Sequence, residues 1–431
     1  MDKIVSLAKR RGFIFPGSEI YGGLANSWDY GPLGVEIKNS IKKSWWERFV
    51  HRRSDMVGID AALIMNPKVW EKSGHLANFS DPLLECNKCH SRFRADEIAH
   101  DPVKQGDRIC PSCKVGKLGD PRKFNLMFKT FIGPAEEATN IAYFRPETAQ
   151  AMFVDFKNVL DTSRKRLPFG IAQIGKAFRN EITPGNFIFR TREFEQMEIE
   201  YFIRPENWEK EFEYWLNEMH GWMKEVGIDM SKVHDHDIAK DELAHYSKRT
   251  VDIEFDYPFG TKELYGLAYR TDFDLKNHFP DKPPYKDPET NEEFYPHVIE
   301  PSLGVDRTLL AVLLSAYSEE GDRVVLKLAP RLAPYKAAVF PLLANKPELV
   351  SLARKVYEGL LGKLMVAWDD RGNIGKRYYA QDEIGTPYCI TVDFDSLEKG
   401  DVTVRDRDTA KQERIPIQDL QNFILDKIYK S

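Results

Sequence analysis

The sequence predicts an α+β domain that carries a cysteine-bearing insert and is followed by a small α/β domain. The first observation is length, because 431 residues exceed what one ordinary hydrophobic core organises. The second is element order: strand patterns dominate residues 169–203, whereas beyond residue 331 apolar strands alternate with helices. The third is a pair of Cys-x-x-Cys motifs in one short stretch. We place the domains at residues 1–330 and 331–431, with the insert at 84–116.

The first long element is an amphipathic helix over residues 33–53. Apolar side chains recur there at near-helical spacing, with charged residues between them, at Val35, Ile37, Ile41, Trp45 and Phe49. The apolar run VGIDAALIM (57–65) follows the helix. This run predicts a short buried strand that ends before Asn66 and Pro67.

The insert contains a set of cysteines with the spacing of a zinc site. Its two Cys-x-x-Cys pairs lie 20 residues apart, at Cys86, Cys89, Cys110 and Cys113. Paired knuckles of this kind bring four thiolates to one tetrahedral Zn²⁺, and a full Cys₄ set leaves no open position for catalysis. We therefore predict a structural zinc. Two disulfides or four free thiols are the alternative, but nothing in the sequence suggests an oxidising compartment.

Residues 176–202 alternate like a strand but carry arginine and glutamate where a buried strand carries valine. One face of this strand would hold Arg190, Arg192, Phe194, Gln196 and Glu198. The other face would join the core through Phe189, Met197, Ile199 and Tyr201. A solvated outer face with paired surface charges is one interpretation of the polar side, and a binding site is the other.

Two features favour a binding site on this strand. Phe194 would place an aromatic ring on a solvent-exposed face. The preceding strand adds Arg179 and Glu181, which lie two residues apart. Guanidinium groups bind phosphate and carboxylate, carboxylates bind amino groups, and an aromatic ring stacks on a planar base. The strand from Phe194 to Glu198 spans about 13 Å, close to the separation between an adenine and an amino group bound end to end. The pattern predicts a site for ATP and an amino acid.

The remaining elements follow from local signals. A first-turn proline and a closing glycine predict a helix over 205–227, and VDIEFDY (251–257) and ELYGLAY (263–269) predict strands. Five prolines mark 279–296 as a surface loop. In the second domain, strands are predicted at 336–342, 364–370 and 388–394, and helices at 348–361 and 418–429.

Composition limits the class of protein. Charged residues make up 30% and hydrophobic residues 42%, the balance of a soluble globular enzyme. No apolar run approaches the roughly 20 residues of a membrane span, and the N-terminus lacks a signal-peptide pattern, so we expect a cytoplasmic protein without a membrane partner. A net charge of −5 gives no general attraction to nucleic acid, and any such partner would need local basic patches.

Several longer motifs add a family resemblance to these patterns. The chain resembles the class II aminoacyl-tRNA synthetases and, within them, the dimeric (alpha2) glycyl-tRNA synthetases. The matching motifs are YGPLG (30–34), NPKVWEKSGH (66–75), FRAD (93–96), FRPETAQ (144–150), REFEQMEIE (192–200) and EPSLGVDR (300–307). Residues 374–393 are similar to the anticodon-binding domain shared by the glycyl, threonyl, prolyl and histidyl enzymes. The matches cover nearly the whole chain.

The resemblance implies a class II catalytic domain with an antiparallel sheet, a zinc-ribbon-like insert and an anticodon-binding α/β domain. It implies ATP-dependent attachment of glycine to tRNA(Gly) through a glycyl-adenylate, with release of AMP and pyrophosphate. Mg²⁺ would accompany the ATP. The enzyme would be a homodimer, with the helix at 33–53 and the following strand in the dimer interface.

Residue roles carry over from the resemblance by match. Arg179 and Arg307 would be catalytic. The positions implied for ATP are Arg179, Asn180, Glu181, Phe189, Arg190, Arg192, Phe194, Glu263, Leu264, Gly304, Asp306 and Arg307. The positions implied for glycine are Arg94, Glu147, Glu198, Glu300 and Ser302. The chain departs from the family at Gly185, where relatives commonly carry an arginine that contacts the tRNA acceptor end.

Two other functions compete with this one. The same fold serves as a nucleic-acid-binding accessory subunit of a polymerase, but such relatives lose the catalytic arginines, and here Arg179 and Arg307 are retained. A synthetase for another amino acid could share the C-terminal domain. The carboxylate-rich set with Ser302 counts against that alternative.

Overall fold

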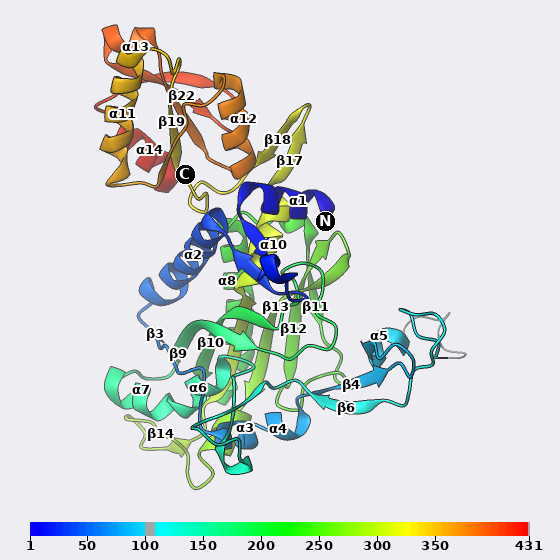
Figure 1. Ribbon diagram of the computed structural model, residues 1–431. Helices are drawn as coiled ribbons and strands as arrows, with labels where there is room; N and C mark the ends of the chain where they lie inside the picture. Colours follow the sequence, from blue (N-terminus) through cyan, green and yellow to red (C-terminus); the bar gives the residue numbers. More distant parts are fainter. Residues whose placement is uncertain (100–107, 430–431) are drawn as a thin grey trace.

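The computed structural model describes residues 1–99 and 108–429, and its larger part is built on one seven-stranded sheet (Figure 1). The strand order is β11-β12-β13-β16-β10-β9-β3, and all pairs are antiparallel except β3 with β9. These strands are β3 (Met56–Gly58), β9 (Phe169–Phe178), β10 (Glu193–Ile203), β11 (Val233–Asp237), β12 (Arg249–Tyr257), β13 (Gly260–Thr271) and β16 (His297–Gly304). The expected α+β domain with an antiparallel sheet is confirmed.

Three helices cover one face of this sheet: α2 (Pro32–Trp46), α8 (Trp208–Glu225) and α10 (Val305–Ala316). The predicted helix at 33–53 is present, although its last part, Glu47–His51, is a π-helical turn. Large rings fill the space between helices and sheet, and Trp45, Trp215 and Trp222 are fully buried there. Met197, Ile199 and Tyr201 of β10 pack into the same core, as the alternation predicts.

The opposite face of the sheet is divided between an apolar end and a polar end. The apolar end packs against α6 (Ala149–Val154), α7 (Phe156–Ser163) and α9 (Phe273–His278), with Phe153, Phe156 and Phe202 in its core. The polar end holds Gln196, Glu198 and Glu200, which are 7%, 2% and 0% exposed. The interpretation of these residues as a solvated outer face is therefore wrong.

The predicted buried strand at 57–65 is also wrong over most of its length. Only β3 pairs with the sheet, and the last backbone hydrogen bond from this run to β9 joins the Ile59 N–H to the Ala172 carbonyl at 2.9 Å. The chain then leaves the sheet edge, where the buried Arg145 guanidinium donates to the Ala61 carbonyl at 2.9 Å. Leu63 and Ile64 are 38% and 39% exposed, so the apolar run does not mark burial here.

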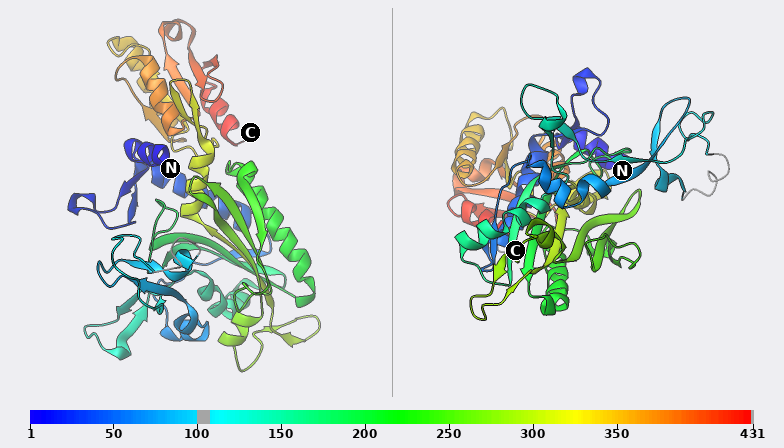
Figure 2. Two further views of the ribbon diagram at one scale, coloured as in Figure 1. Left: turned by 90° about the vertical axis from the view of Figure 1, so that its right-hand side faces the viewer. Right: turned by 90° about the horizontal axis from the view of Figure 1, so that it is seen from below.

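The cysteine-bearing insert is a separate small sheet that projects from the larger part of the molecule (Figures 1 and 2). Its strands, in the order β5-β4-β6, are β4 (Ser80–Glu85), β5 (Arg92–Arg94) and β6 (Arg122–Asn125), and α5 (Ala95–Ala99) packs on them. Residues 100–107 of the insert lie outside the described residues. The described part of the insert shares no strand with the seven-stranded sheet.

The C-terminal part contains a five-stranded mixed sheet of order β20-β19-β21-β22-β23. It consists of β19 (Ala337–Pro341), β20 (Val366–Trp368), β21 (Tyr388–Val392), β22 (Asp401–Asp406) and β23 (Gln412–Pro416), with α11 (Pro347–Leu361), α12 (Ile374–Ile384), α13 (Phe394–Lys399) and α14 (Leu420–Tyr429). The predicted α/β pattern and its helices are confirmed. The strand predicted to reach residue 394 ends at Val392, because Asp393 and Ser396 form a capping box that starts α13.

An ion pair between Asp382 and Arg323 links the two parts of the chain. Asp382 on α12 is fully buried, accepts two hydrogen bonds from Arg405, at 2.9 and 3.1 Å, and lies 3.6 Å from Arg323 of the β17–β18 hairpin (Tyr317–Glu320, Arg323–Leu326). The predicted loop at 279–296 holds only the two-residue strands β14 (Tyr285–Lys286) and β15 (Glu293–Phe294). In the part of the chain that the structure describes, no helix is both long and apolar enough to cross a bilayer.

The remaining described elements are short. They are α1 (Asp2–Arg11), β1 (Ile14–Pro16), β2 (Trp28–Tyr30), α3 (Pro67–Lys72), α4 (His75–Asn78), β7 (Lys129–Phe131) and β8 (Ile141–Tyr143).

Candidate functional site

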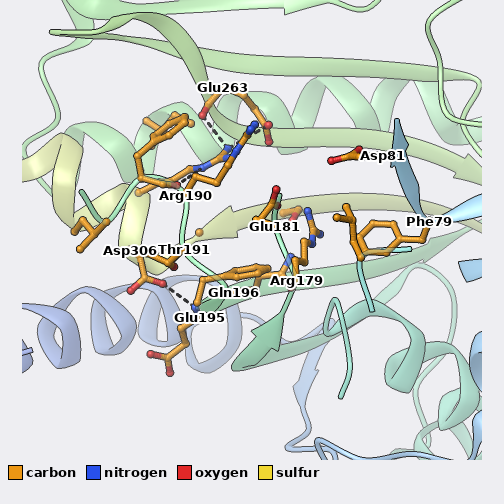
Figure 3. A pocket seen from close by; sticks show the side chains of 18 of the residues that line it. Phe79, Asp81, Arg179, Glu181, Arg190, Thr191, Glu195, Gln196, Glu263 and Asp306 are labelled. Atoms are coloured by element: carbon orange, nitrogen blue, oxygen red, sulfur yellow. Dashed lines mark hydrogen bonds and ion pairs between the residues drawn. The ribbon is translucent and has the colours of Figure 1, made fainter. Parts of the chain in front are cut away.

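Two adjoining pockets open on the polar end of the sheet. The first, which we call the arginine pocket, has a volume of about 320 Å³ (Figure 3). It is lined by Phe79, Asp81, Arg94, Leu126, Arg179, Glu181, Ile188, Phe189, Arg190, Thr191, Phe194, Glu195, Gln196, Glu263, Leu264, Ser302, Gly304, Asp306 and Arg307. The second, the glutamate pocket, has a similar volume of about 320 Å³. It includes Glu147, Glu198, Glu300, Tyr246, Gly266 and Arg270. Arg179, Gln196 and Ser302 line both pockets.

Arg179 lies where the two pockets meet, immediately after β9. Its Nε donates to the Pro146 carbonyl at 3.0 Å, and its guanidinium lies 5.3 Å from the Phe194 ring and 5.4 Å from the Phe79 ring. Among the described residues, its two terminal nitrogens have no hydrogen-bond partner. A guanidinium held in this way presents two donors to an anion that spans the pockets.

Arg307 lies at the far side of the arginine pocket, in the first turn of α10. Its Nη1 donates to the Glu263 carbonyl at 2.9 Å and lies 3.1 Å from the Glu263 carboxylate. The guanidinium also stacks over the Phe189 ring, 4.5 Å from its centroid. The charge of Arg307 lowers the pKa of Glu263. Arg307 is thus a cation fixed by Glu263, in a part of the arginine pocket that does not border the glutamate pocket.

The loop before β10 differs from the predicted strand. β10 begins at Glu193, and residues 186–189 form a turn closed by hydrogen bonds between Gly185 and Arg190, at 3.0 and 3.2 Å. Asn186 and Phe187 have φ of 58° and 62°, which a strand cannot contain. Arg190 and Phe189 therefore reach the arginine pocket from the loop, while Phe194 and Gln196 reach it from β10.

Two residues expected in the arginine pocket lie elsewhere. Asn180 and Arg192 line an adjoining cavity between this loop and the N-terminal hairpin of β1 and β2. This cavity shares Ile188, Thr191 and Asp306 with the arginine pocket. The Arg192 Nη1 donates to the Ala25 carbonyl at 3.3 Å. Arg94 also departs from expectation, because it lines the arginine pocket beside Asp81, at 2.9 Å, and not the glutamate pocket.

The remaining expected residues are brought together. Glu181, Leu264, Gly304 and Asp306 line the arginine pocket, whereas Glu147, Glu198, Glu300 and Ser302 surround the glutamate pocket. Glu181 is 9% exposed, and its Oε2 is buried without a partner among the described residues.

Glu198 is a buried carboxylate that accepts hydrogen bonds on both oxygens. Oε2 accepts from the Thr148 N–H, at 3.1 Å, and from the Thr148 hydroxyl. Oε1 accepts from the Ser302 hydroxyl at 2.6 Å and from the Gln196 amide at 2.7 Å. Burial raises the pKa of Glu198, and the nearby charge of Glu147 adds to the rise.

Glu147 and Glu300 have opposite electrostatic environments. Burial acts to raise the pKa of Glu147, but His75, whose Nε2 lies 3.2 Å away, acts together with Arg270 and Gln150 to outweigh it, and the net pKa is lowered. Burial raises the pKa of Glu300 to about 8 although Arg270 donates to it at 2.8 Å. A pair of carboxyls with separated pKa values next to a cavity is typical of a binding or catalytic site.

Sequence reasoning missed several residues of these pockets. Phe79 and Asp81 line the arginine pocket from the start of the insert, and Tyr246 and Arg270 line the glutamate pocket. Glu200 is fully buried behind them, and neither carboxylate oxygen has a partner among the described residues. The alternation along β10 contained the signal for Glu200, which shares a face with Gln196 and Glu198.

The four cysteines of the insert form a cluster that suits a metal ion. Their sulfur atoms all lie within 4.8 Å of one another. The Cys86–Cys113 and Cys89–Cys110 sulfur distances are 3.7 and 3.5 Å, well beyond a disulfide bond of about 2.05 Å. The two-disulfide alternative is therefore not formed.

Backbone groups also shape the cysteine cluster. The Lys88 and Gly116 N–H groups donate to the sulfurs of Cys86 and Cys113, at 3.4 and 3.2 Å. A Cβ at Gly116 would lie 2.3 Å from the Cys86 sulfur, so the backbone approaches that sulfur as closely as glycine allows. These donors favour thiolates, and a set of four thiolates fits Zn²⁺.

Comparison with known families agrees with this geometry. The family "tRNA synthetase class II core domain (G, H, P, S and T)" matches residues 131–316, which contain β9, β10, β16 and both catalytic candidates. The family "Anticodon binding domain" matches residues 336–427, which contain the five-stranded sheet. The fold and the two pockets therefore define a class II aminoacyl-tRNA synthetase.

The chain can be placed more narrowly from its relatives. It is 52% identical to the glycine–tRNA ligases of Alkaliphilus oremlandii and Geobacillus kaustophilus, over 99% of this chain and 98% and 99% of those proteins. It is 53% identical to the glycine–tRNA ligase of Clostridium acetobutylicum, over 99% of this chain and 98% of that protein. The chain belongs to the glycine–tRNA ligase family.

Proposed function

We propose that this protein attaches glycine to tRNA(Gly) in an ATP-dependent reaction that passes through glycyl-adenylate and releases AMP and pyrophosphate. The observation that carries the proposal is the position of Arg179 in the shared wall of the two pockets. An arginine there contacts the ATP α-phosphate from one pocket and the glycine carboxylate from the other. It thereby holds the two reacting groups together.

The arginine pocket supplies the nucleotide contacts in this proposal. Phe194 stacks on the adenine, and Glu181 accepts from its amino group, a role supported by the unpartnered buried Oε2 of Glu181. Arg190 and Arg307 bind the triphosphate, and Mg²⁺ bound with ATP supplies further charge neutralisation. The remaining lining positions of this set are Phe189, Glu263, Leu264 and Gly304.

Four of the family positions are assigned differently in this proposal. Arg94 belongs with the nucleotide, because it lines the arginine pocket. Asn180 and Arg192 lie outside that pocket and are not assigned to ATP. Asp306 acts through its neighbours, since both of its oxygens accept hydrogen bonds from protein groups.

The glutamate pocket holds glycine in this proposal. Glu147 and Glu300 face the ammonium, and the Ser302 hydroxyl, which donates to Glu198, has lone pairs left to accept from it. The crowded carboxyls leave little room for a larger side chain, which favours glycine over alanine.

The reaction requires little proton transfer at its first step. The glycine carboxylate is already ionised, so one of its oxygens attacks the α-phosphorus and pyrophosphate leaves without a general base. In the second step the 3′-hydroxyl of the terminal tRNA adenosine attacks the glycyl carbonyl, and AMP leaves. The protein contributes position and charge to both steps.

The other parts of the chain have separate roles. We assign residues 1–330 to catalysis and residues 331–431 to binding of the tRNA anticodon. The thiolates of Cys86, Cys89, Cys110 and Cys113 would hold a structural Zn²⁺ with no open coordination position.

The working form is a cytoplasmic homodimer in this proposal, with α2 and the segment after β3 in the interface. The support is exposed apolar surface on these segments, at Val35, Leu63 and Ile64.

The deciding experiment is ATP–pyrophosphate exchange dependent on the amino acid, followed by charging of tRNA(Gly). Exchange with glycine and none with alanine or threonine is expected. Equal exchange with the three amino acids would point to a synthetase of other specificity. Tight tRNA binding without any exchange would point to an accessory nucleic-acid-binding subunit.

A further inference from the structure

One buried carboxylate, that of Asp306, joins three distant segments of the chain. Its Oδ1 accepts from the Lys38 ammonium of α2 at 3.0 Å and from the Tyr30 hydroxyl of β2. Its Oδ2 accepts from the backbone N–H of Glu195 in β10 at 2.7 Å. Asp306 itself belongs to the first turn of α10, so the contacts link a strand, a helix and the N-terminal hairpin.

Lys38 lies at the centre of this group. Its Nζ is also 3.1 Å from the Glu195 carboxylate and 4.1 Å from the centroid of the Tyr30 ring. Lys38, Glu195 and Asp306 are 5%, 9% and 6% exposed. Buried charges are stable only when they are paired and hydrogen-bonded, and each of these three is.

The charges of the group balance. Two carboxylates, Glu195 and Asp306, share the buried Lys38, and the half-buried Lys42 contributes a second cation 3.1 Å from Glu195. Burial acts to lower the pKa of Lys38, but the two carboxylates outweigh it and raise the pKa. Loss of the Lys38 charge would leave two close carboxylates to repel each other in a poorly solvated space.

The group adjoins the arginine pocket, and Glu195 and Asp306 are among the residues that line it. Glu195 precedes Gln196 and follows Phe194, and Asp306 precedes Arg307, so every anchored residue is a sequence neighbour of a pocket residue. Side chains on adjacent positions of a strand point to opposite faces, so Glu195 can be held from behind while Phe194 faces the pocket. The spacing between Phe194 and Arg307 therefore depends on how closely β10 and α10 are drawn together.

We propose that Lys38 is a positioning residue for the nucleotide, which fixes Phe194 relative to Arg307 without touching the ligand. The inference rests on the proposed function in one respect, that the arginine pocket binds ATP. Lys38 holds Glu195 and Asp306 together. These two residues in turn hold the Phe194 ring and the Arg307 guanidinium at the distance that the nucleotide spans. Small displacements of binding groups weaken binding strongly, so the contribution is measurable.

The test compares Lys38→Met with Lys43→Met in the full-length protein. Methionine keeps the length and apolar character of the lysine stem while removing its charge. Lys43 is a matched control, because it lies on the same helix with a side chain that is 72% exposed and pairs only loosely with Glu47, at 3.8 Å. The dissociation constants for ATP and for glycine are measured by titration calorimetry, and unfolding by the thermal midpoint Tm.

Lys38→Met is expected to raise the Kd for ATP about tenfold and to change the Kd for glycine by less than twofold. Lys43→Met is expected to change neither. An unchanged Kd for ATP, or equal weakening of ATP and glycine, would overturn the inference, because a purely structural role would not separate the two ligands.

Two further results keep the test decisive. If Lys38→Met does not fold, Tyr30→Phe removes a single hydrogen bond to Asp306 and should raise the Kd for ATP about threefold; no change would refute the inference. Binding of ATP does not depend on which amino acid is activated. If the wild-type protein shows no exchange with glycine, the proposed substrate is refuted. If Lys38→Met still weakens ATP binding in that case, the role of Lys38 is supported.

Discussion

Replacement of Arg179 by alanine tests the central geometry of the site. The substitution removes the two terminal guanidinium nitrogens, which have no protein partner among the described residues and lie between the two pockets. It leaves the β9 and β10 backbones unchanged, because the bond from the Arg179 N–H to the Arg192 carbonyl, 2.9 Å long, does not involve the side chain.

The expected loss follows from the bonds that the guanidinium would make. Hydrogen bonds to charged groups contribute about 1.5–3 kcal/mol each, and one bond to phosphate and one to carboxylate give about 3–6 kcal/mol. Since about 1.4 kcal/mol corresponds to a tenfold change in rate, glycine-dependent exchange should fall by about 10²–10⁴.

The effect on folding should be small by comparison. The side chain makes ring contacts with Phe79 and Phe194, each worth about 0.5–1 kcal/mol at a partly exposed site, and its Nε bond to the Pro146 carbonyl contributes about 0.5–1.5 kcal/mol more. The Tm should therefore fall by only a few degrees.

The assay is ATP–pyrophosphate exchange at saturating glycine, with circular dichroism to follow Tm. Arg166→Ala is the matched control, because Arg166 is 65% exposed and pairs only with Glu289 at 3.0 Å. Exchange within tenfold of wild type in the Arg179 variant would refute the assignment of this residue to both substrates. A large fall in Tm that accompanies the loss of exchange activity would show that Arg179 acts by stabilising the fold.

Four other substitutions have defined outcomes. Cys110→Ser should reduce bound zinc, measured by atomic absorption, from about one ion per chain to a small fraction, and an unchanged zinc content would contradict the Cys₄ site. Gly175→Ala should lower the free energy of unfolding, measured by denaturant titration, by about 1–3 kcal/mol, because the new Cβ would lie 2.1 Å from the Arg145 Nη2. Gly359→Ala, in open space on α11, should raise the free energy of unfolding by about 0.5–1 kcal/mol. Burial raises the pKa of Glu300 to about 8, so this carboxyl is mostly neutral at pH 6 and becomes an anion as the pH rises through 8. An ammonium prefers the anion, so the KM for glycine should fall with rising pH by at most about tenfold per unit, and Glu300→Gln should abolish that dependence.

Local patterns in the sequence predicted some elements well. The helix at 33–53 and the core side of β10 follow from periodicity alone, because burial of one face sets the spacing of apolar residues. The Cys-x-x-Cys spacing predicted the sulfur cluster for a similar reason, since each pair is brought together within a few residues.

Other features depended on contacts that no local pattern records. The alternation from Phe189 to Ile199 suggested one continuous strand, but positive φ at Asn186 and Phe187 turns the chain and delays β10 to Glu193. Arg270 is the clearest omission, because it meets Glu300 only through the pairing of β13 with β16. Asp81 lines the arginine pocket from β4, just before the predicted start of the insert at residue 84, where no motif marked it.

Strand β4 connects the cysteine cluster to the arginine pocket. Asp81 of this strand lines the pocket and Leu84 packs in the insert core, and Cys86 follows the strand directly. Two ligands that order the same segment must each strengthen the binding of the other by the same factor. Bound ATP should thus lower the Kd for Zn²⁺ in a competition with a chelator, and oxidation of the thiols should weaken ATP binding while the seven-stranded sheet keeps its hydrogen-exchange protection.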